Sequence, residues 1–120
     1  MFDMVLILRN APSPLMLLAI ISRFEQGITL GELTNILEEL QKHGIDLGYK
    51  FVPLIKTKIS KELMLDLNLL KVLNLIVDND GKIMVTEKAK LLLSKLYNKD
   101  ATIKRIMTML IRVQPNRLNM

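Results

Sequence analysis

The strongest candidate for a binding chemistry is a group of lysines at residues 50–61. Twelve residues without an Asp or Glu contain Lys50, Lys56, Lys58 and Lys61, together with Thr57 and Ser60. Ammonium and hydroxyl groups near the start of a helix, whose first N–H groups are unpaired, favour contact with phosphate oxygens. Alternating lysines also protect exposed edge strands from aggregation. We favour phosphate contact because acids are absent from this stretch.

Side chains that could read base edges are few on the helix expected at residues 60–76. Such reading needs an exposed row of Arg, Asn, Gln or Ser. The polar residues here are spread around the helix and include two acids: Lys61, Glu62, Asp66, Asn68, Lys71 and Asn74. Asn68 and Lys71 remain as candidates for base contact. Apolar residues cover almost the whole circumference, which predicts partial burial under residues 45–59, the last helix or a second subunit.

A tight turn at residues 78–81 (DNDG) predicts a β-hairpin with strands at 75–77 and 82–85. Lys82 is its basic residue and joins the candidates for contact with DNA. Asp78 and Asp80 make the tip net negative, so we interpret the hairpin as mainly structural.

Catalytic chemistry has little support in these residues. The one histidine, His43, stands at the end of an expected helix, where interaction with the last carbonyls is its predicted role. The chain has no Cys, which removes thiol catalysis and zinc ribbons. No metalloprotease, serine-hydrolase or phosphate-cradling glycine motif occurs. We expect a protein that is not an enzyme, with no cofactor and no metal.

The elements that position these residues are mainly helical. We expect helices from about Pro12 to Gly27, from Thr29 to Gly44, from Ser60 to about Ile76, from Thr86 to about Tyr97 and from Asp100 to about 114. Thr29 and Glu32 fit a capping box. Met4–Leu8 is a strand or a packed arm. Residues 45–59 predict either two short strands or one extended arm, with Pro53 at an edge.

The expected C-terminal helix has an apolar stripe beside basic residues. Ile103, Ile106, Met107 and Leu110 repeat at helical spacing, next to Lys104, Arg105 and Arg112. The stripe predicts dimerisation, since an isologous contact would place two basic arms on one side of a dimer. A basic amphipathic helix also fits an anionic lipid surface, although this one has no Trp or Phe to anchor it.

Composition indicates one domain, residues 1–120, with a core at about 12–97 and an aliphatic interior. No uncharged apolar run is long enough for a bilayer span, so we expect no membrane contact and a cytoplasmic location. The net charge of +5 is uneven, because residues 1–49 have three basic and six acidic side chains and residues 50–120 have fourteen and six. This asymmetry fits either a face for a polyanion or ordinary solubilisation by lysines.

With these elements in place, the chain resembles the winged helix-turn-helix transcriptional regulators of prokaryotes. The likeness covers about half of the chain and is nearest to small YwgA-like winged-helix proteins. It runs through ITLGELTNILEEL, SKELMLDLNLLKVLNLI, DNDGKIMV as the wing and TEKAKLLLSKL. The chain departs from the pattern in residues 45–59, which are longer than the usual turn between the two helices, and at Ala89, where a glycine is usual.

The sequence therefore predicts a mainly α protein with a small β component, a winged helix-turn-helix with an extra C-terminal helix. The resemblance implies a small dimeric transcriptional regulator that binds double-stranded DNA. The alternative is a winged-helix module that grips a protein partner through its apolar third helix and its fifth helix. The missing polar row on the third helix and the acidic hairpin tip favour that alternative.

Overall fold

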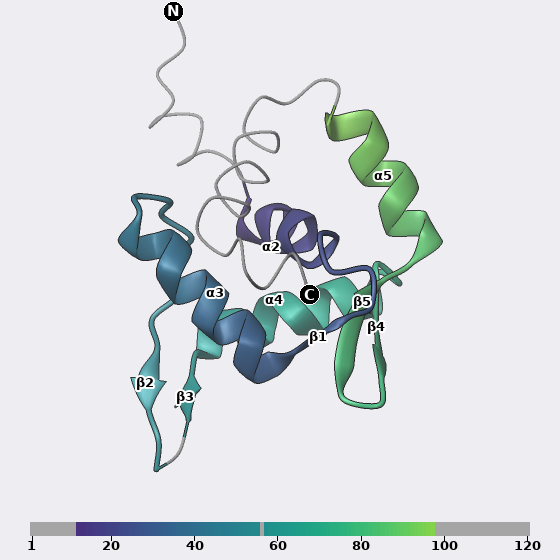
Figure 1. Cartoon of the computed structure of the whole chain (residues 1–120). Coiled ribbons are helices and arrows are strands. Elements are labelled where there is room, and N and C mark those ends of the chain that lie inside the picture. Colours follow the sequence, from purple (N-terminus) through teal and green to yellow (C-terminus); the bar gives the residue numbers. More distant parts are fainter. Residues whose placement is uncertain (1–11, 56, 98–120) are drawn as a thin grey trace, which may run out of the picture.

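The computed structural model describes residues 12–55 and 57–97 (Figure 1). In chain order the elements are α2 (Ser13–Ile21), β1 (Ile28–Thr29), α3 (Leu30–Lys42), β2 (Val52–Pro53), β3 (Lys58–Ile59), α4 (Lys61–Val72), β4 (Ile76–Asn79), β5 (Lys82–Val85) and α5 (Glu87–Tyr97). The strands form a three-stranded and a two-stranded antiparallel sheet. The described part therefore agrees with the predicted mainly helical chain with a small β component.

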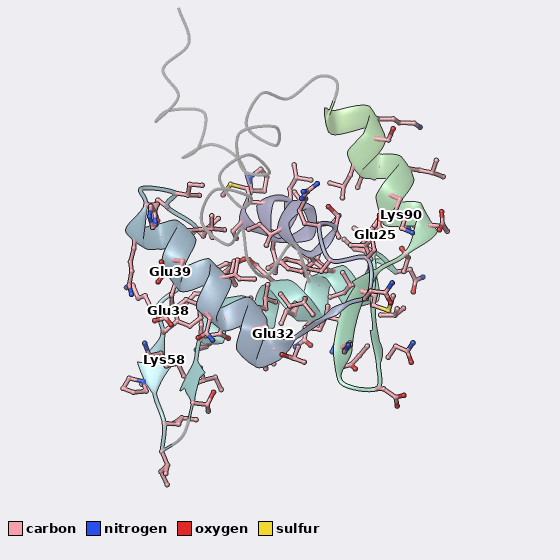
Figure 2. All side chains as sticks on the ribbon, viewed as in Figure 1. Glu25, Glu32, Glu38, Glu39, Lys58 and Lys90 are labelled. Carbon is pink, nitrogen blue, oxygen red and sulfur yellow. The ribbon has the colours of Figure 1, made fainter. Side chains whose placement is uncertain are left out.

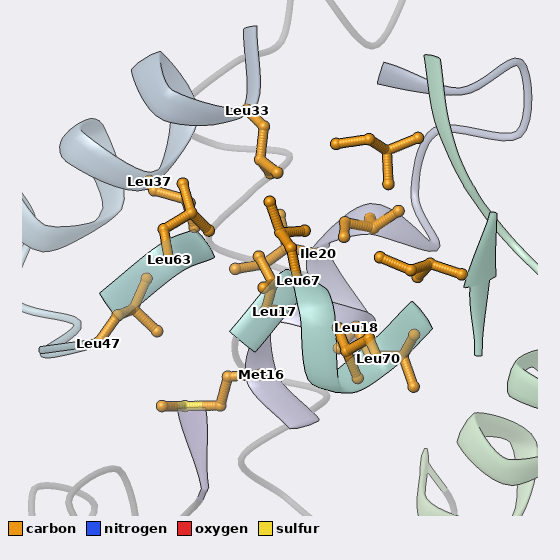
Figure 3. Close-up of a cluster of buried hydrophobic side chains, with 14 of the residues drawn as sticks. Met16, Leu17, Leu18, Ile20, Leu33, Leu37, Leu47, Leu63, Leu67 and Leu70 are labelled. Atoms are coloured by element: carbon orange, nitrogen blue, oxygen red, sulfur yellow. The ribbon is translucent and has the colours of Figure 1, made fainter. Parts of the chain in front are cut away.

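Helix α2 lies at the centre of the core. Its residues from Met16 to Ile21 are all buried, as expected for a helix that is apolar on every side. Leucines of α3 and α4, among them Leu37 and Leu67, surround it (Figure 3). The helix ends at Ile21 rather than at the predicted Gly27.

Gly27 is needed for the close approach of the chain to β5. Its φ is +88°, and a Cβ at this position would lie 2.9 Å from Lys82 Cβ and 2.9 Å from Met84 Cγ. A glycine has neither the conformational penalty nor the clash. It therefore lets β1 pair with β5, with Ile28 opposite Ile83.

Helix α3 begins and ends as its sequence predicts. Glu32 N donates to Thr29 Oγ1 over 3.2 Å, and Thr29 N donates to Glu32 Oε1 over 3.1 Å, which confirms the capping box. At the other end Gly44 has φ +94°, and Ile45 N donates to Leu40 O over 3.1 Å. This is the Schellman ending expected at a glycine.

Helix α4 starts at the predicted cap but ends earlier than predicted. Leu63 N donates to Ser60 Oγ over 3.2 Å. The helix stops at Val72 rather than near Ile76, because Asn74 takes a left-handed φ of 60°. Leu75 N then donates to Leu70 O over 2.9 Å, a second Schellman ending with asparagine in place of glycine.

The predicted hairpin after α4 is confirmed, with its first strand at Ile76–Asn79 rather than 75–77. Asn79 pairs with Lys82, so the turn has two central residues. These residues, Asp80 and Gly81, have positive φ values of 54° and 79°. Positive φ at both positions defines the type I′ turn that matches the twist of a hairpin. In the sheet, β5 lies between β1 and β4.

The segment between α3 and α4 contains a second hairpin, which we call the arm (residues 50–59). Val52 pairs with Ile59 and Pro53 with Lys58. Leu54 N donates to Thr57 O over 2.7 Å at the tip. Of the two predictions for residues 45–59, the pair of short strands is the one observed.

Two predicted elements lie outside the described residues: the apolar run Met4–Leu8 and the helix at about 100–114. The second contains the predicted dimerisation residues Ile103, Ile106, Met107 and Leu110. Within residues 12–55 and 57–97, the structure contains no helix with the length and apolar character that a membrane span requires.

Candidate functional site

One side of α4 is solvent-exposed and mostly apolar. Leu63, Leu67 and Leu70 face the core. The opposite side, which we call the α4 face, consists of Lys61, Leu65, Asn68, Leu69 and Val72. Leu65, Leu69 and Val72 are 60%, 45% and 79% exposed. Residues 45–59, the last helix or a second subunit were expected to cover part of this helix; within the described residues, Leu65, Leu69 and Val72 remain exposed.

Two hairpins stand at the ends of this face. The arm leads directly into the first residue of α4, and the β4–β5 hairpin follows its end. In Figure 1 both hairpins extend to the same side of the molecule, with α4 between them. Twelve helical residues rise about 18 Å, which sets the scale of the gap between the hairpin roots. The exposed α4 face therefore belongs to a helix that has a hairpin at each end.

The lysines predicted to bind phosphate do not all remain available. Lys58 Nζ lies 2.9 Å from Glu38 Oε2 of α3, so a carboxylate already neutralises this ammonium (Figure 2). Lys50 and Lys61 are exposed and form no ion pair with any described residue. Lys56 lies outside the described residues. Among the described residues beside the start of α4, Lys50 and Lys61 are thus the lysines without an ion pair, and the charge of Lys50 also helps to lower the pKa of Glu62.

The two predicted hydroxyl contacts differ in their surroundings. Ser60 is buried, and its Oγ accepts from Leu63 N and donates to Glu62 Oε1. Its hydroxyl therefore serves the helix cap rather than an outside phosphate. Thr57 is exposed near the arm tip, with only a long 3.4 Å contact to Lys58 O.

Both acids of α4 are held by the protein itself. Lys50 N donates to Glu62 Oε1 over 3.1 Å, and this bond is the largest of the effects that lower the pKa of Glu62. Asp66 Oδ2 accepts from Ser13 Oγ over 2.6 Å and from Tyr49 Oη over 2.7 Å. These bonds hold both carboxylates in place but come from uncharged donors, so they do not neutralise the acids that were expected to repel phosphates.

Tyr49 and Gln41 fix the root of the arm. Tyr49 N donates to Gln41 Oε1, and Gln41 Nε2 donates to Tyr49 O, each over 3.0 Å. Burial, with further effects from the bond to Asp66, raises the pKa of Tyr49 far above its usual 10.0. Sequence reasoning missed this connection because Gln41, Tyr49 and Asp66 share no local motif.

Asn68 and Lys71, the candidates for base contact, are both exposed. Asn68 lies within the α4 face among leucines and valine, whereas Lys71 lies at its border. At the far hairpin Lys82 is also exposed, beside exposed Asp78 and Asp80. Asp78 Oδ1 accepts from Gly81 N over 3.0 Å, so this carboxylate stabilises the turn.

A shallow groove of about 430 Å³ separates the arm from α3. Gly31 and Asn35 line one side, and Pro53, Leu54 and Thr57 line the other. The Glu38–Lys58 ion pair bridges the same two elements. The arm tip is therefore separated from α3 by this groove.

His43 Nδ1 lies 2.8 Å from Glu39 O, which agrees with the predicted interaction at the end of α3. The described residues contain no cluster of His, Asp and Glu that could hold a metal ion.

In comparisons with known proteins, no family model, no curated protein and no solved structure matches this chain.

Proposed function

We propose that this chain is a winged-helix protein that binds double-stranded DNA. The observation that carries the proposal is the exposed α4 face on a helix that lies between two hairpins, which project to one side (Figure 1). The resemblance also supports the proposal, because it implies a helix that leads into a hairpin and then into another helix. In this chain α4 is followed by the β4–β5 hairpin and by α5. In this proposal α4 is the recognition helix and the β4–β5 hairpin is the wing.

The length of α4 and the positions of the two hairpins suit a duplex. A major groove is about 12 Å wide and admits one α-helix. With α4 in the groove, the arm and the wing would reach the sugar-phosphate backbone on either side, about 18 Å apart at their roots. Phosphate contacts would then fix the orientation of the protein on the DNA.

The charges support binding with modest affinity. Lys50 and Lys61 at the arm end form no ion pair with any described residue, and Lys71 and Lys82 are exposed at the wing end. Asn68 is the one amide within the α4 face, so hydrogen-bonded base reading is limited to it. Leu65, Leu69 and Val72 could contact thymine methyl groups but no donor or acceptor edge. We therefore propose weak sequence preference.

We also propose that the protein is a small transcriptional regulator in the cytoplasm. It would form a homodimer through the residues Ile103, Ile106, Met107 and Leu110. A dimer that contacts about three phosphates per chain gives a slope of log affinity against log salt of about −5. A monomer gives about half of that slope.

A second candidate function is docking to a protein partner through the α4 face. The specific observation in its favour is the exposed row Leu65, Leu69 and Val72, because exposed apolar residues on adjacent turns favour protein contacts. The pairing of Lys58 with Glu38 also reduces the positive charge of the arm. In this alternative, duplex DNA does not bind.

Fluorescence anisotropy with a labelled mixed-sequence duplex tests the proposal. The full chain is titrated at several salt concentrations, beside Lys61→Gln and the control Lys95→Gln, which removes the same charge from exposed α5. We expect binding that weakens steeply with salt. Lys61→Gln should lower the slope by about 0.9 for each bound chain, about 1.8 for a dimer, while Lys95→Gln leaves it unchanged. Absence of binding at low salt contradicts the proposal and favours the protein-docking alternative.

A further inference from the structure

The tip of the arm is apolar, and no other part of the described chain covers it. Ile55 is 99% exposed, the highest value among the exposed large apolar residues, and Leu54 beside it is also exposed. Val52 and Ile59, the facing pair of the two strands, are exposed as well. An isolated apolar side chain on a surface needs no explanation, but four on one short hairpin form a patch.

The arm is connected to the body of the protein by several polar contacts. Gln41 binds both backbone groups of Tyr49 at its root, and Tyr49 Oη donates to Asp66 of α4. Glu38 holds Lys58 on the returning strand. The hydrogen bond from Leu54 N to Thr57 O closes the tip. These contacts tie the root and the returning strand of the arm to α3 and α4.

The surroundings of the tip favour a polyanion over a protein surface. No Asp or Glu occurs from Leu47 to Lys61, and Lys50 and Lys56 flank the apolar tip in the sequence, while Lys58 is paired with Glu38 of α3. An apolar tip between cations matches the minor groove, where proteins insert Ile, Leu or Pro between base pairs while lysines contact the phosphates. The five residues from Phe51 to Ile55 span about 13 Å, enough to cross one backbone and enter a groove about 7.5 Å deep.

We propose that Ile55 is a wedge that enters the minor groove next to the α4 site and kinks the duplex. Two paired backbones lie about 5 Å apart, and a minor groove is about 6 Å wide. The arm fits only if the groove widens, and partial unstacking of one base step produces that widening. Flexible pyrimidine–purine steps would be preferred, which gives sequence preference without hydrogen bonds to bases.

The inference rests on the proposed function and is tested by bending rather than by binding. A duplex of about 25 base pairs has a donor dye at one end and an acceptor at the other. The full chain should raise energy transfer, as expected for a bend of about 20–90°. Ile55→Ala should bind about fivefold more weakly and leave the duplex straight.

Leu91→Ala is the matched control, since it removes an equally apolar, exposed side chain from α5. It should bind and bend like the natural chain. Ile55→Leu should restore the bend, because a large apolar side chain is retained.

The outcomes separate the wedge from the DNA-binding proposal. Binding without a bend, or an unchanged bend in Ile55→Ala, overturns the wedge and leaves DNA binding intact. No binding to the duplex at low salt overturns both. Binding to vesicles of anionic phosphatidylglycerol that Ile55→Ala abolishes, with DNA bending unaffected, would assign the tip to lipid and overturn the wedge.

Discussion

The two hairpins at the ends of α4 have similar positions and opposite chemistry. The β4–β5 hairpin has paired strands of four residues, a type I′ turn and β1 along its other edge. Its tip contains Asp78 and Asp80. The arm has two-residue strands, an apolar tip and flanking lysines. The first hairpin is built for stability and the second for contact, so we expect mutations in them to affect different properties.

The largest effect on stability is expected at Gly27, where β1 meets the β4–β5 hairpin. Gly27→Ala places a Cβ 2.9 Å from Lys82 Cβ at a φ of +88°. We expect a loss of about 2–3 kcal/mol in the free energy of unfolding, measured by urea denaturation. Ile55→Ala in the arm should change it by less than about 0.5 kcal/mol. Equal losses in the two variants would contradict the division of roles.

The next effect is expected at the root of the arm. Asp66→Ala leaves the hydroxyls of Ser13 and Tyr49 without their acceptor. A partly buried donor without a partner costs about 1–3 kcal/mol. Urea denaturation should show this loss, and Asp66→Asn, which keeps an acceptor oxygen, should lose less. If both variants are as stable as the natural chain, Asp66 does not fix the arm.

Alkaline pH provides a third comparison. The pKa of Tyr49 is raised in the folded protein, so folding favours the neutral phenol. The stabilisation is complete below the unfolded pKa of about 10 and falls as the pH rises above it. Stability of the natural chain should decrease above pH 10, and Tyr49→Phe should show less of this decrease. The same slope in both chains would show that Tyr49 is not responsible.

The smallest expected effect concerns the Glu38–Lys58 ion pair. Glu38→Gln keeps the shape of the side chain and frees the ammonium of Lys58. We expect duplex affinity to rise about fivefold. The slope of log affinity against log salt should steepen by about 0.9 for each bound chain. Glu39→Gln is the control, because Glu39 pairs with Lys42 instead. Stability should change little in either variant, since exposed ion pairs contribute about 0–1 kcal/mol. Equal affinities would place Lys58 outside the DNA contact.

Local signals in the sequence predicted most of the fold. Thr29 with Glu32, Ser60, Gly44 and the Asp-Gly turn each act within a few residues, and each is found where predicted. Asn74 also had a local signal, since asparagine tolerates a left-handed φ, but the apolar run around it favoured a longer helix. Local sequence patterns were therefore sufficient to predict whether a segment is a helix or a strand, but they predicted the ends of these elements less well.

The candidate site depended on contacts between distant residues, which spacing does not reveal. Lys58 and Glu38 are twenty positions apart, and Asp66 is fifty-three positions from Ser13. The sequence placed the lysines near the start of α4, but their spacing could not decide whether an acid of α3 such as Glu38 pairs with one of them. It also counted Glu62 and Asp66 as repulsive, whereas the fold turns both toward hydrogen-bond donors.

The most direct test of the central claim uses the absence of cysteine from the chain. Asn68→Cys on the α4 face and Leu91→Cys on α5 each provide a single thiol for attachment of a DNA-cleaving iron chelate. If the duplex lies against the α4 face between the two hairpins, the reagent on residue 68 cleaves bound DNA at defined positions and the reagent on residue 91 does not. Equal cleavage from both positions, or cleavage from residue 91 alone, would contradict the account.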